Sequence, residues 1–403
     1  MKTYKIANIL FVSVFLIFIL LGMAVTIFKP KESVSYYENR TLAAQPEIKA
    51  ELMLESDYFY RWERFLTDHA AARSTLVRLG AYIDLNIVKR PVVNDVITVN
   101  TFSGDDLYLG FNAYETIDPQ SIRNQAVSIV TEIKSLSDVI TGYGGSLYYV
   151  SVPAHYAWYA DQYPWYLNNR AEYTSLSLEE FRDAMLSAGL NHIAIGDILP
   201  EIFDPPRLYS LSDHHYTFRG AYETYRAIID RINSDGLYTL PFYSEDDLTF
   251  STLENPFLGS RMRRILSIPG LTEHIEIAVP NEEVSFTRTD NGRQREIPTV
   301  YSLPYNVWDV VDYTIYMGGD VPETVIETGR DLPSVLIFGD SSTNAVECLM
   351  YLSCGEFRSV DLRHYKEMPL SAYVEKYRPD IVIGIRGYEV LLEMTGNGVL
   401  TGS

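Results

Sequence analysis

The run Val335-Leu336-Ile337-Phe338-Gly339-Asp340-Ser341-Ser342 decides the fold class of this chain. It begins as a buried-strand pattern, passes into a turn of small residues, and is followed by a helical pattern over 343–352. In an open α/β sheet such a turn lies at the carboxyl edge of the strands, where ligands bind and helix N–H groups can stabilise an oxyanion. Ser341 is therefore a candidate nucleophile. The alternative is a plain helix N-cap, which favours Ser and Asp whatever the function.

Helical and strand-like patterns alternate on both sides of this turn. Helical patterns cover 121–140, 178–188, 218–232 and 370–377, and strand-like patterns cover 146–152, 193–198, 360–362 and 381–385. Strands that alternate with helices of this length predict an α/β fold, with a mainly parallel sheet and helices on both faces. Between about 240 and 330 the alternation breaks, with turn signals such as Thr289-Asp290-Asn291-Gly292 between β-rich runs. We predict a β-rich insertion there.

The N-terminus carries an apolar run from Ile6 to Phe28 that contains no charged residue. At 1.5 Å per residue a helix of that length measures about 34 Å, enough to cross a hydrocarbon core of about 30 Å. The run ends without a small-x-small cleavage site, which favours an uncleaved anchor over a signal peptide. Lys2 and Lys5 favour an N-in orientation, although Lys29 and Lys31 on the other flank weaken the asymmetry. We predict a single-pass protein of the cell membrane whose C-terminal part lies outside the cytoplasm.

Three parts are expected along the chain. Residues 1–30 form the anchor, residues 31–93 form a polar connector and a helical lead-in, and residues 94–403 form the α/β domain with its insertion. The lead-in contains apolar positions at helical spacing from Tyr58 to Ile83, which predict one helix. Val96 to Asn100 and Leu107 to Phe111 flank a turn of Ser, Gly and Asp and predict a hairpin.

Composition restricts the partners. The chain holds 33 Lys and Arg against 53 Asp and Glu, a formal charge of -20, so nucleic acid would be repelled and is excluded as a ligand. Its 31 tyrosines suit contacts with sugar rings, but Tyr-rich surfaces also occur on secreted proteins without a sugar ligand. Cys348 and Cys354 are the only cysteines, six residues apart, and are expected as buried or free thiols and not as a disulfide.

A serine nucleophile needs a base, and the base needs an acid that orients it. Asp213-His214-His215-Tyr216 places a carboxylate two residues before His215, a spacing at which one turn can bring the acid onto the imidazole. His155 is the next candidate base, with Asp161 as the nearest carboxylate that follows it. The same Asp/His cluster could bind a metal, but no third or fourth ligand is spaced to join it. We therefore predict neither a metal nor a cofactor.

Asp213-His214-His215-Tyr216 followed by Gly339-Asp340-Ser341 resembles the DHHW family and the related alginate O-acetyltransferase-like domains of the SGNH-hydrolase superfamily. The other matching pieces are Glu38-Asn39-Arg40-Thr41-Leu42, Asp68-His69 with Arg73, Gly318-Gly319-Asp320, Asp361-Leu362-Arg363 and Arg378-Pro379-Asp380. Each piece is weak alone, but their order is specific and covers nearly the whole chain beyond the anchor. The resemblance implies an SGNH-like three-layer α/β/α domain.

The resemblance also implies residue roles. It makes Ser341 the nucleophile, His215 the base and Asp213 the partner of that base. These roles fit the chemistry of a triad, in which the acid fixes the tautomer of the histidine that takes the serine proton.

Four further residues are expected around the substrate or the oxyanion. Arg363 matches an arginine that such domains place near the serine, and Gly318 and Gly319 would let backbone N–H groups approach the pocket. Tyr216 stands where the family name has tryptophan. Asp320 stands where an asparagine donor would be more natural, because an ionised Asp320 cannot donate to an oxyanion.

Two functions remain open at this stage. The first is transfer or removal of an acyl group, O-acetyl above all, on a cell-envelope polysaccharide or exopolysaccharide, with a membrane-bound acyl-donor protein as a further partner. The second is a non-catalytic envelope protein of the same fold that binds glycan or a membrane partner, because fold resemblance does not establish activity.

The single apolar run generates a prediction of topology. A protease added to intact cells should digest most of the chain and leave a short N-terminal fragment, because only that fragment is embedded in the membrane. Immunoblotting with N-terminal and C-terminal tags measures this. Protection of the whole chain until the cells are lysed would contradict the outward orientation.

Overall fold

The computed structural model describes residues 2–35, 37, 40–100, 106–111, 117–167, 170–199, 208–271, 273–393 and 400–401. These residues fall into two compact units. The first, the N-terminal unit, comprises the chain up to Asn94 together with Met262–Gly270, and the second, the α/β unit, comprises Asp95–Arg261 and the chain from Leu271 onward. Of the motif that begins at Glu38, Glu38 and Asn39 lie outside the described residues.

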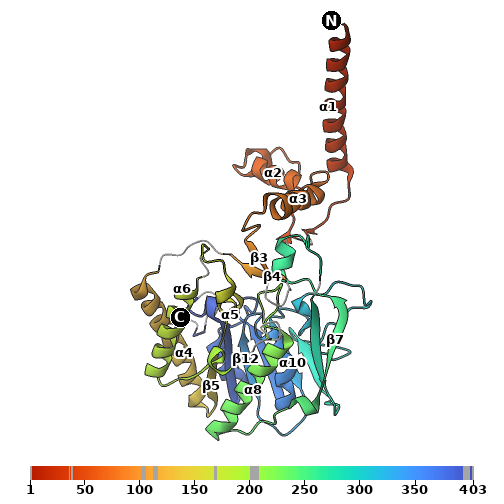
Figure 1. Cartoon of the computed structure of the whole chain (residues 1–403). Helices are drawn as coiled ribbons and strands as arrows, with labels where there is room; N and C mark the ends of the chain where they lie inside the picture. Colours follow the sequence, from red (N-terminus) through yellow and green to blue (C-terminus); the bar gives the residue numbers. More distant parts are fainter. Residues whose placement is uncertain are drawn as a thin grey trace. The chain divides into compact units, whose positions relative to one another are not determined.

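An eight-stranded sheet forms the centre of the α/β unit (Figure 1). In spatial order the strands are β10 (Arg293–Gln294), β9 (Thr287–Asp290), β11 (Glu323–Glu327), β13 (Glu356–Asp361), β12 (Val335–Gly339), β14 (Ile381–Gly387), β5 (Ser146–Val152) and β6 (Asn191–Ala194). The strands from β13 to β6 run parallel to their neighbours, whereas β11, β9 and β10 are added antiparallel. The predicted α/β class with a mainly parallel sheet is confirmed.

Helices cover both faces of this sheet because successive residues of each buried strand point to opposite sides. On β5, Tyr149 packs against Phe181 of α6 (Ala171–Ser187), in a core shared with α4 (Pro119–Gly142) and α11 (Leu370–Tyr377). The neighbouring Tyr148 points the other way, towards Asp235 at the end of α8 (Phe218–Asp235). Helix α10 (Asn344–Met350) packs beside α8 on that second face (Figure 1).

The segment predicted as a β-rich insertion is β-rich, but it is not a separate sheet throughout. Strands β7 (Leu248–Pro256) and β8 (His274–Pro280) form their own antiparallel pair, whereas β9, β10 and β11 extend the main sheet. Between β7 and β8, the short helix α9 (Ser260–Arg264) leads into residues 262–270, which belong to the N-terminal unit. The proposed division into 1–30, 31–93 and 94–403 stays a prediction.

The predicted single helix from Tyr58 to Ile83 is wrong. The structure has α2 (Tyr58–Asp68), α3 (Arg73–Tyr82) and a π-helical turn η2 (Ile83–Val88), with Ala72 left-handed at φ 57° in the break. At the break Asp68 accepts hydrogen bonds from Arg40 and from the Ala43 N–H, and the Ala71 N–H donates to Thr26 Oγ1 at 2.9 Å. These tertiary partners replace helical bonds that local periodicity assumes.

Helix α1 (Lys2–Phe28) begins the N-terminal unit and contains a stretch, Tyr4–Phe28, that is long and apolar enough to cross a membrane. It is followed by the short antiparallel pair of β1 (Val34–Ser35) and β2 (Arg40–Thr41), and then by the 3-10 turn η1 (Leu52–Leu54) before α2.

Several smaller expectations can also be compared with the structure. The hairpin is confirmed as β3 (Val96–Asn100) and β4 (Asp106–Gly110), although its turn at 101–105 lies outside the described residues. The strand expected over 193–198 ends at Ala194 and is followed by α7 (Ile195–Ile198).

Both cysteines are free and buried, as expected. The remaining short helices are α5 (His155–Trp158), η3 (Ala160–Gln162), η5 (Glu245–Asp247), η6 (Tyr313–Ile315), η7 (Tyr351–Ser353) and η8 (Tyr388–Val390).

Candidate active site

Ser341 lies at the carboxyl end of β12, among the parallel strands. Close packing of the strands requires glycine at position 339, two residues before the serine, because a Cβ there would come within 2.4 Å of the Ile385 carbonyl oxygen of β14. After Gly339 the chain turns, and the Asp340 carboxylate accepts the Ser342 N–H at 2.9 Å. The serine is thus held in a tight turn that is closed by the side chain before it.

Ser342 does not cap the helix that follows the turn. Thr343 occupies the N-cap position and α10 begins at Asn344, because the Asp340 side chain closes a separate turn first. Both backbone polar groups of Ser342 form hydrogen bonds. Its N–H donates to Asp340, and its carbonyl accepts from the Tyr216 hydroxyl.

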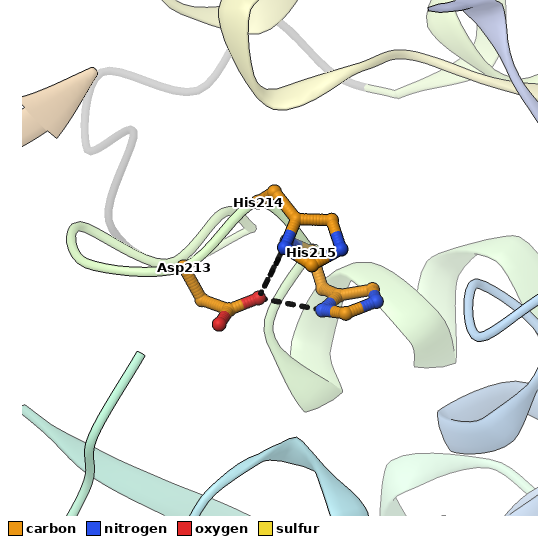
Figure 2. Close-up of side chains that lie close together, drawn as sticks. All are labelled: Asp213, His214 and His215. Atoms are coloured by element: carbon orange, nitrogen blue, oxygen red, sulfur yellow. Dashed lines mark hydrogen bonds and ion pairs between the residues drawn. The ribbon is translucent and has the colours of Figure 1, made fainter. Parts of the chain in front are cut away.

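His215 connects the serine to a buried acid. Its Nε2 lies 2.8 Å from Ser341 Oγ, and its Nδ1 lies 2.5 Å from Asp213 Oδ1 (Figure 2). Asp213 and His215 are 3% and 8% exposed. The structure therefore brings together the three residues that the sequence pattern selected, from segments 126 positions apart.

The Asp213 carboxylate is surrounded by donors. Besides the His215 ring, the His215 N–H donates to Oδ1 at 3.0 Å and the Ser260 N–H donates to Oδ2 at 2.5 Å. Burial alone would raise the pKa of Asp213, but the charges of His214 and His215 and these hydrogen bonds hold that pKa well below its usual range. Asp213 is accordingly an ionised acceptor, which fixes a proton on His215 Nδ1 and leaves Nε2 free to accept one from the serine.

His214 and His155 hold other positions. His214 Nδ1 lies 2.8 Å from Ser260 Oγ. The same atom lies 3.3 Å from Asp213 Oδ1 (Figure 2). The buried His155 bonds through Nε2 to the Ser210 carbonyl oxygen at 2.8 Å, and burial, followed by the charge of Arg261, lowers its pKa to about 3. A neutral His155 supports the loop that carries Asp213 and does not face the serine directly.

Asp213, His214 and His215 also lie close enough together for one metal ion, as do Asp320, Asp361 and His364. In the first group the Nδ1 atoms of both imidazoles point at the same Asp213 oxygen (Figure 2). Asp213 Oδ2 already accepts the Ser260 N–H. In this arrangement two ring N–H groups donate to one carboxylate. A metal ion could bind there only by displacing these hydrogen bonds.

Glu273, which the sequence reading missed, holds the other side of the same loop. One of its carboxylate oxygens accepts from Ser210 Oγ at 2.8 Å and from Ser212 N and Oγ at 3.1 and 2.5 Å, and the other accepts from the Leu211 N–H at 2.9 Å. Ser210 Oγ in turn accepts the Asp213 N–H at 2.9 Å. A single glutamate before a strand gives no local signal, so only the tertiary structure reveals it.

Tyr313 is a second residue that the sequence did not select. Its ring stacks on the His215 ring at 3.8 Å between centroids and 5° between planes. A flat aromatic face parallel to the imidazole limits ring rotation and favours the cationic form that arises when His215 takes a proton. The predicted site residue Tyr216 lies nearby, buried, with its hydroxyl on the Ser342 carbonyl.

Several donors of the residues expected around the oxyanion already form hydrogen bonds or ion pairs within the protein. Arg363 is held by two carboxylates, with its Nη2 at 2.6 Å from Asp361 and 3.0 Å from Asp320. Gly318 and Gly319 have φ of 80° and 92°, which favours glycine, and the Gly319 N–H donates to the Tyr316 carbonyl at 3.0 Å. This N–H is therefore already used within its own turn.

An asparagine amide does lie beside Asp320, but it comes from another element. Nδ2 of Asn344, the first residue of α10, donates to Asp320 Oδ1 at 3.1 Å. Asp320 thus accepts from both Asn344 and Arg363, and so links the glycine turn to the segment that follows the serine.

No protein-family model and no curated protein matches the sequence. Solved structures do match. PatB1 from Bacillus cereus is 19% identical, with 76% of this chain and 100% of that chain covered at a TM-score of 0.59. Its structure with a sulfonyl adduct has a TM-score of 0.61, over 73% and 96% of the two chains. A DHHW family protein from Eubacterium siraeum is 15% identical, over 76% and 95%, with a TM-score of 0.58.

The chain has the fold of PatB1 and of this DHHW family protein. The resemblance inferred from the sequence is thereby confirmed at the level of the fold. At identities below one fifth, the roles of individual DHHW-type residues in this chain must be argued from its own geometry.

The two histidines of the loop generate the first site prediction. His215→Ala should lower ester turnover roughly 10⁴-fold, because it removes the ring that links the serine to the carboxylate, whereas His214→Ala should cost far less. Steady-state hydrolysis of an aryl acetate by the full chain in detergent measures this, with thermal unfolding as the check on folding. Equal losses at both positions would contradict the assignment of the base.

Glu273 generates the second site prediction. In Glu273→Gln the new amide NH₂ would face at least one of the loop's own donors, which should cost about 1–3 kcal/mol of stability and disturb Asp213. We expect a lower Tm together with reduced turnover. Glu276→Gln is the matched control, because Glu276 lies three residues further on, in β8, where it pairs with Arg219 of α8 at 2.8 Å. Equal effects of the two substitutions would show that Glu273 has no special relation to the site.

Proposed function

We propose that this chain is an outward-facing acyltransferase or esterase that moves O-acetyl groups on a cell-envelope polysaccharide or exopolysaccharide through Ser341, His215 and Asp213. The observation that carries the proposal is the continuous hydrogen-bonded chain from Ser341 Oγ through both nitrogens of His215 to a buried, ionised Asp213. Such a chain activates a serine hydroxyl, which is a weak nucleophile on its own.

In the first half-reaction, Ser341 Oγ attacks the carbonyl carbon of the acyl donor while its proton passes to His215 Nε2. A tetrahedral oxyanion forms, and the imidazolium is stabilised by Asp213 on one side and by the stacked Tyr313 ring on the other. When the bond to the leaving alcohol breaks, that oxygen takes the proton from Nε2. The products are an acyl-serine and a free alcohol.

In the second half-reaction a hydroxyl group attacks the acyl-serine, and His215 Nε2 takes its proton and returns it to Ser341 Oγ. If the hydroxyl belongs to a sugar, the chain is a transferase; if it belongs to water, the chain is an esterase. The same residues serve both outcomes, and the access of water to the acyl-serine decides between them.

The location and the substrate class belong to the same proposal. A helix long enough to span a membrane precedes the α/β unit, which supports action at the cell envelope. The acidic composition disfavours nucleic acid, whereas the tyrosine content suits sugar rings. The resemblance to alginate O-acetyltransferase-like domains supports an acetyl donor, which for a membrane-anchored enzyme would be a membrane-bound acyl-donor protein.

The serine turn generates the prediction that tests this function. The full chain should be labelled by a serine-reactive sulfonyl fluoride or phosphonate, and Ser341→Ala should abolish both labelling and ester turnover without lowering the Tm. Ser342→Ala should retain both, because the hydrogen bonds that hold Ser342 come from its backbone and the substitution leaves them in place. Intact-protein mass spectrometry measures the adduct.

Two outcomes would overturn the proposal. Label that persists on Ser341→Ala and disappears from Ser342→Ala would move the nucleophile. If the wild-type chain stays unlabelled under conditions that label a control esterase, the non-catalytic envelope protein becomes the better account.

A further inference from the structure

The N-terminal unit exposes an unusual amount of apolar surface. We call it the lead-in face and define it by Phe59, Leu66, Leu76, Leu79 and Ile87. Phe59, Leu76 and Ile87 are 71%, 62% and 68% exposed. On α3 only Ala81 is buried, so this helix presents most of its leucine and valine side chains outward. Large apolar side chains exposed on successive helical turns usually mark a surface that something binds, whereas single ones scattered over a surface do not.

The exposed side chains follow helical stripes and are not scattered. On α2 the exposed Phe59 and Leu66 are seven residues apart, which places them on one side of the helix, and the half-buried Trp62 lies between them in sequence. The buried Tyr58 and Phe65 lie on another side of α2.

The same spacing continues through the next helix. Leu76, Leu79, Ile83 and Ile87 recur at three and four residues along α3 and into η2. A helix with an outward apolar stripe is typical of a segment that lies along a membrane surface.

Within the N-terminal unit, the turn between α2 and α3 is held against the end of α1, the helix that would cross the membrane. The Ala71 N–H, in the turn between α2 and α3, donates to Thr26 Oγ1 in the last turn of α1 at 2.9 Å. The Lys31 ammonium lies 5.5 Å from the centre of the Phe65 ring. With α1 in a bilayer, these contacts place the turn between α2 and α3 at the depth where α1 leaves the hydrocarbon (Figure 1).

Charge is distributed in a way that permits this contact. Residues 31–90 contain nine Lys and Arg and nine Asp and Glu, whereas residues 91–403 contain 21 Lys and Arg against 44 Asp and Glu. The strongly acidic part of the chain would be repelled by anionic headgroups, but the lead-in would not. Arg64 and Arg78 lie beside Tyr60 and Tyr37, with long apolar stems that suit an interface.

We propose that the lead-in face lies in the headgroup layer of the outer leaflet, so that the chain has a second, interfacial membrane contact besides α1. The occupant of this face is the lipid surface itself. The inference rests on the proposed insertion of α1, but it does not depend on any catalytic activity. It predicts that α2, α3 and η2 stay at the bilayer surface when the chain is in its membrane.

The test uses the full chain with single cysteines in vesicles of phosphatidylcholine and phosphatidylglycerol. Leu79→Cys and Ile87→Cys carry a fluorophore on the lead-in face, Leu16→Cys carries it within α1, and Leu186→Cys carries it on an exposed site of α6. The native cysteines are buried, and the unsubstituted chain serves as the labelling blank. A lipid with a quencher near its headgroup and a water-soluble quencher report the surroundings of each probe.

We expect the probes at 79 and 87 to be quenched by the lipid about two- to threefold more than the probe at 186, and less by the aqueous quencher. If they match the probe at 186 while the probe at 16 stays shielded from water, α1 is inserted but the lead-in face is not at the lipid. If they are shielded from both quenchers, protein covers the face, either the α/β unit or a second copy. Both results would overturn the proposal, and a water-exposed probe at 16 would overturn the anchor on which it rests.

Discussion

A carboxylate taken out of water needs donors for its lone pairs, and Asp213 shows how this requirement shapes a site. Its oxygens receive the His215 ring, the His215 N–H and the Ser260 N–H, so the loop at 213–215 and the start of α9 are fixed around one charge. Because the same charge orients the imidazole towards Ser341, the constraint that folds the loop would also prepare His215 for its proposed role as the base. Structure and chemistry here depend on a single ionised group.

A second carboxylate stabilises the first from the opposite side of the loop. Glu273 accepts from Ser210, Leu211 and Ser212 but makes no direct bond to the triad among the interactions of the described residues. Its influence passes through Ser210 Oγ, which accepts the Asp213 N–H. Backbone donors of the loop are thus shared between two acids, each of which would be costly to bury alone. This explains how a short segment without regular structure can be held rigidly enough for proton transfer.

The sequence predicted what depends on local patterns. Alternating periodicity was sufficient for the parallel sheet, whereas the three residues that meet were selected by the Asp-x-His spacing and the serine turn together with the family resemblance. The sequence could not predict that Glu273 or Tyr313 belongs to the site. Each reaches the site from a distant segment whose neighbouring residues form no recognisable motif. The break between α2 and α3 was missed for the same reason, since the partner of Ala71 is Thr26, 45 residues earlier.

The helix after the serine turn begins later than the sequence pattern predicts, and this changes which groups could stabilise negative charge beside Ser341. Because α10 begins only at Asn344 and is seven residues long, a helix N-terminus is a weak source of oxyanion stabilisation for Ser341. The turn instead contains the Asp340 carboxylate, a negative charge next to the place where another would form. The buried guanidinium of Arg386, on the adjacent strand β14, lies 3.5 Å from that carboxylate and offsets its charge. The Asp340–Arg386 pair therefore allows one side chain to close the serine turn without opposing the oxyanion of the proposed reaction, whose donors would have to come from groups around the turn.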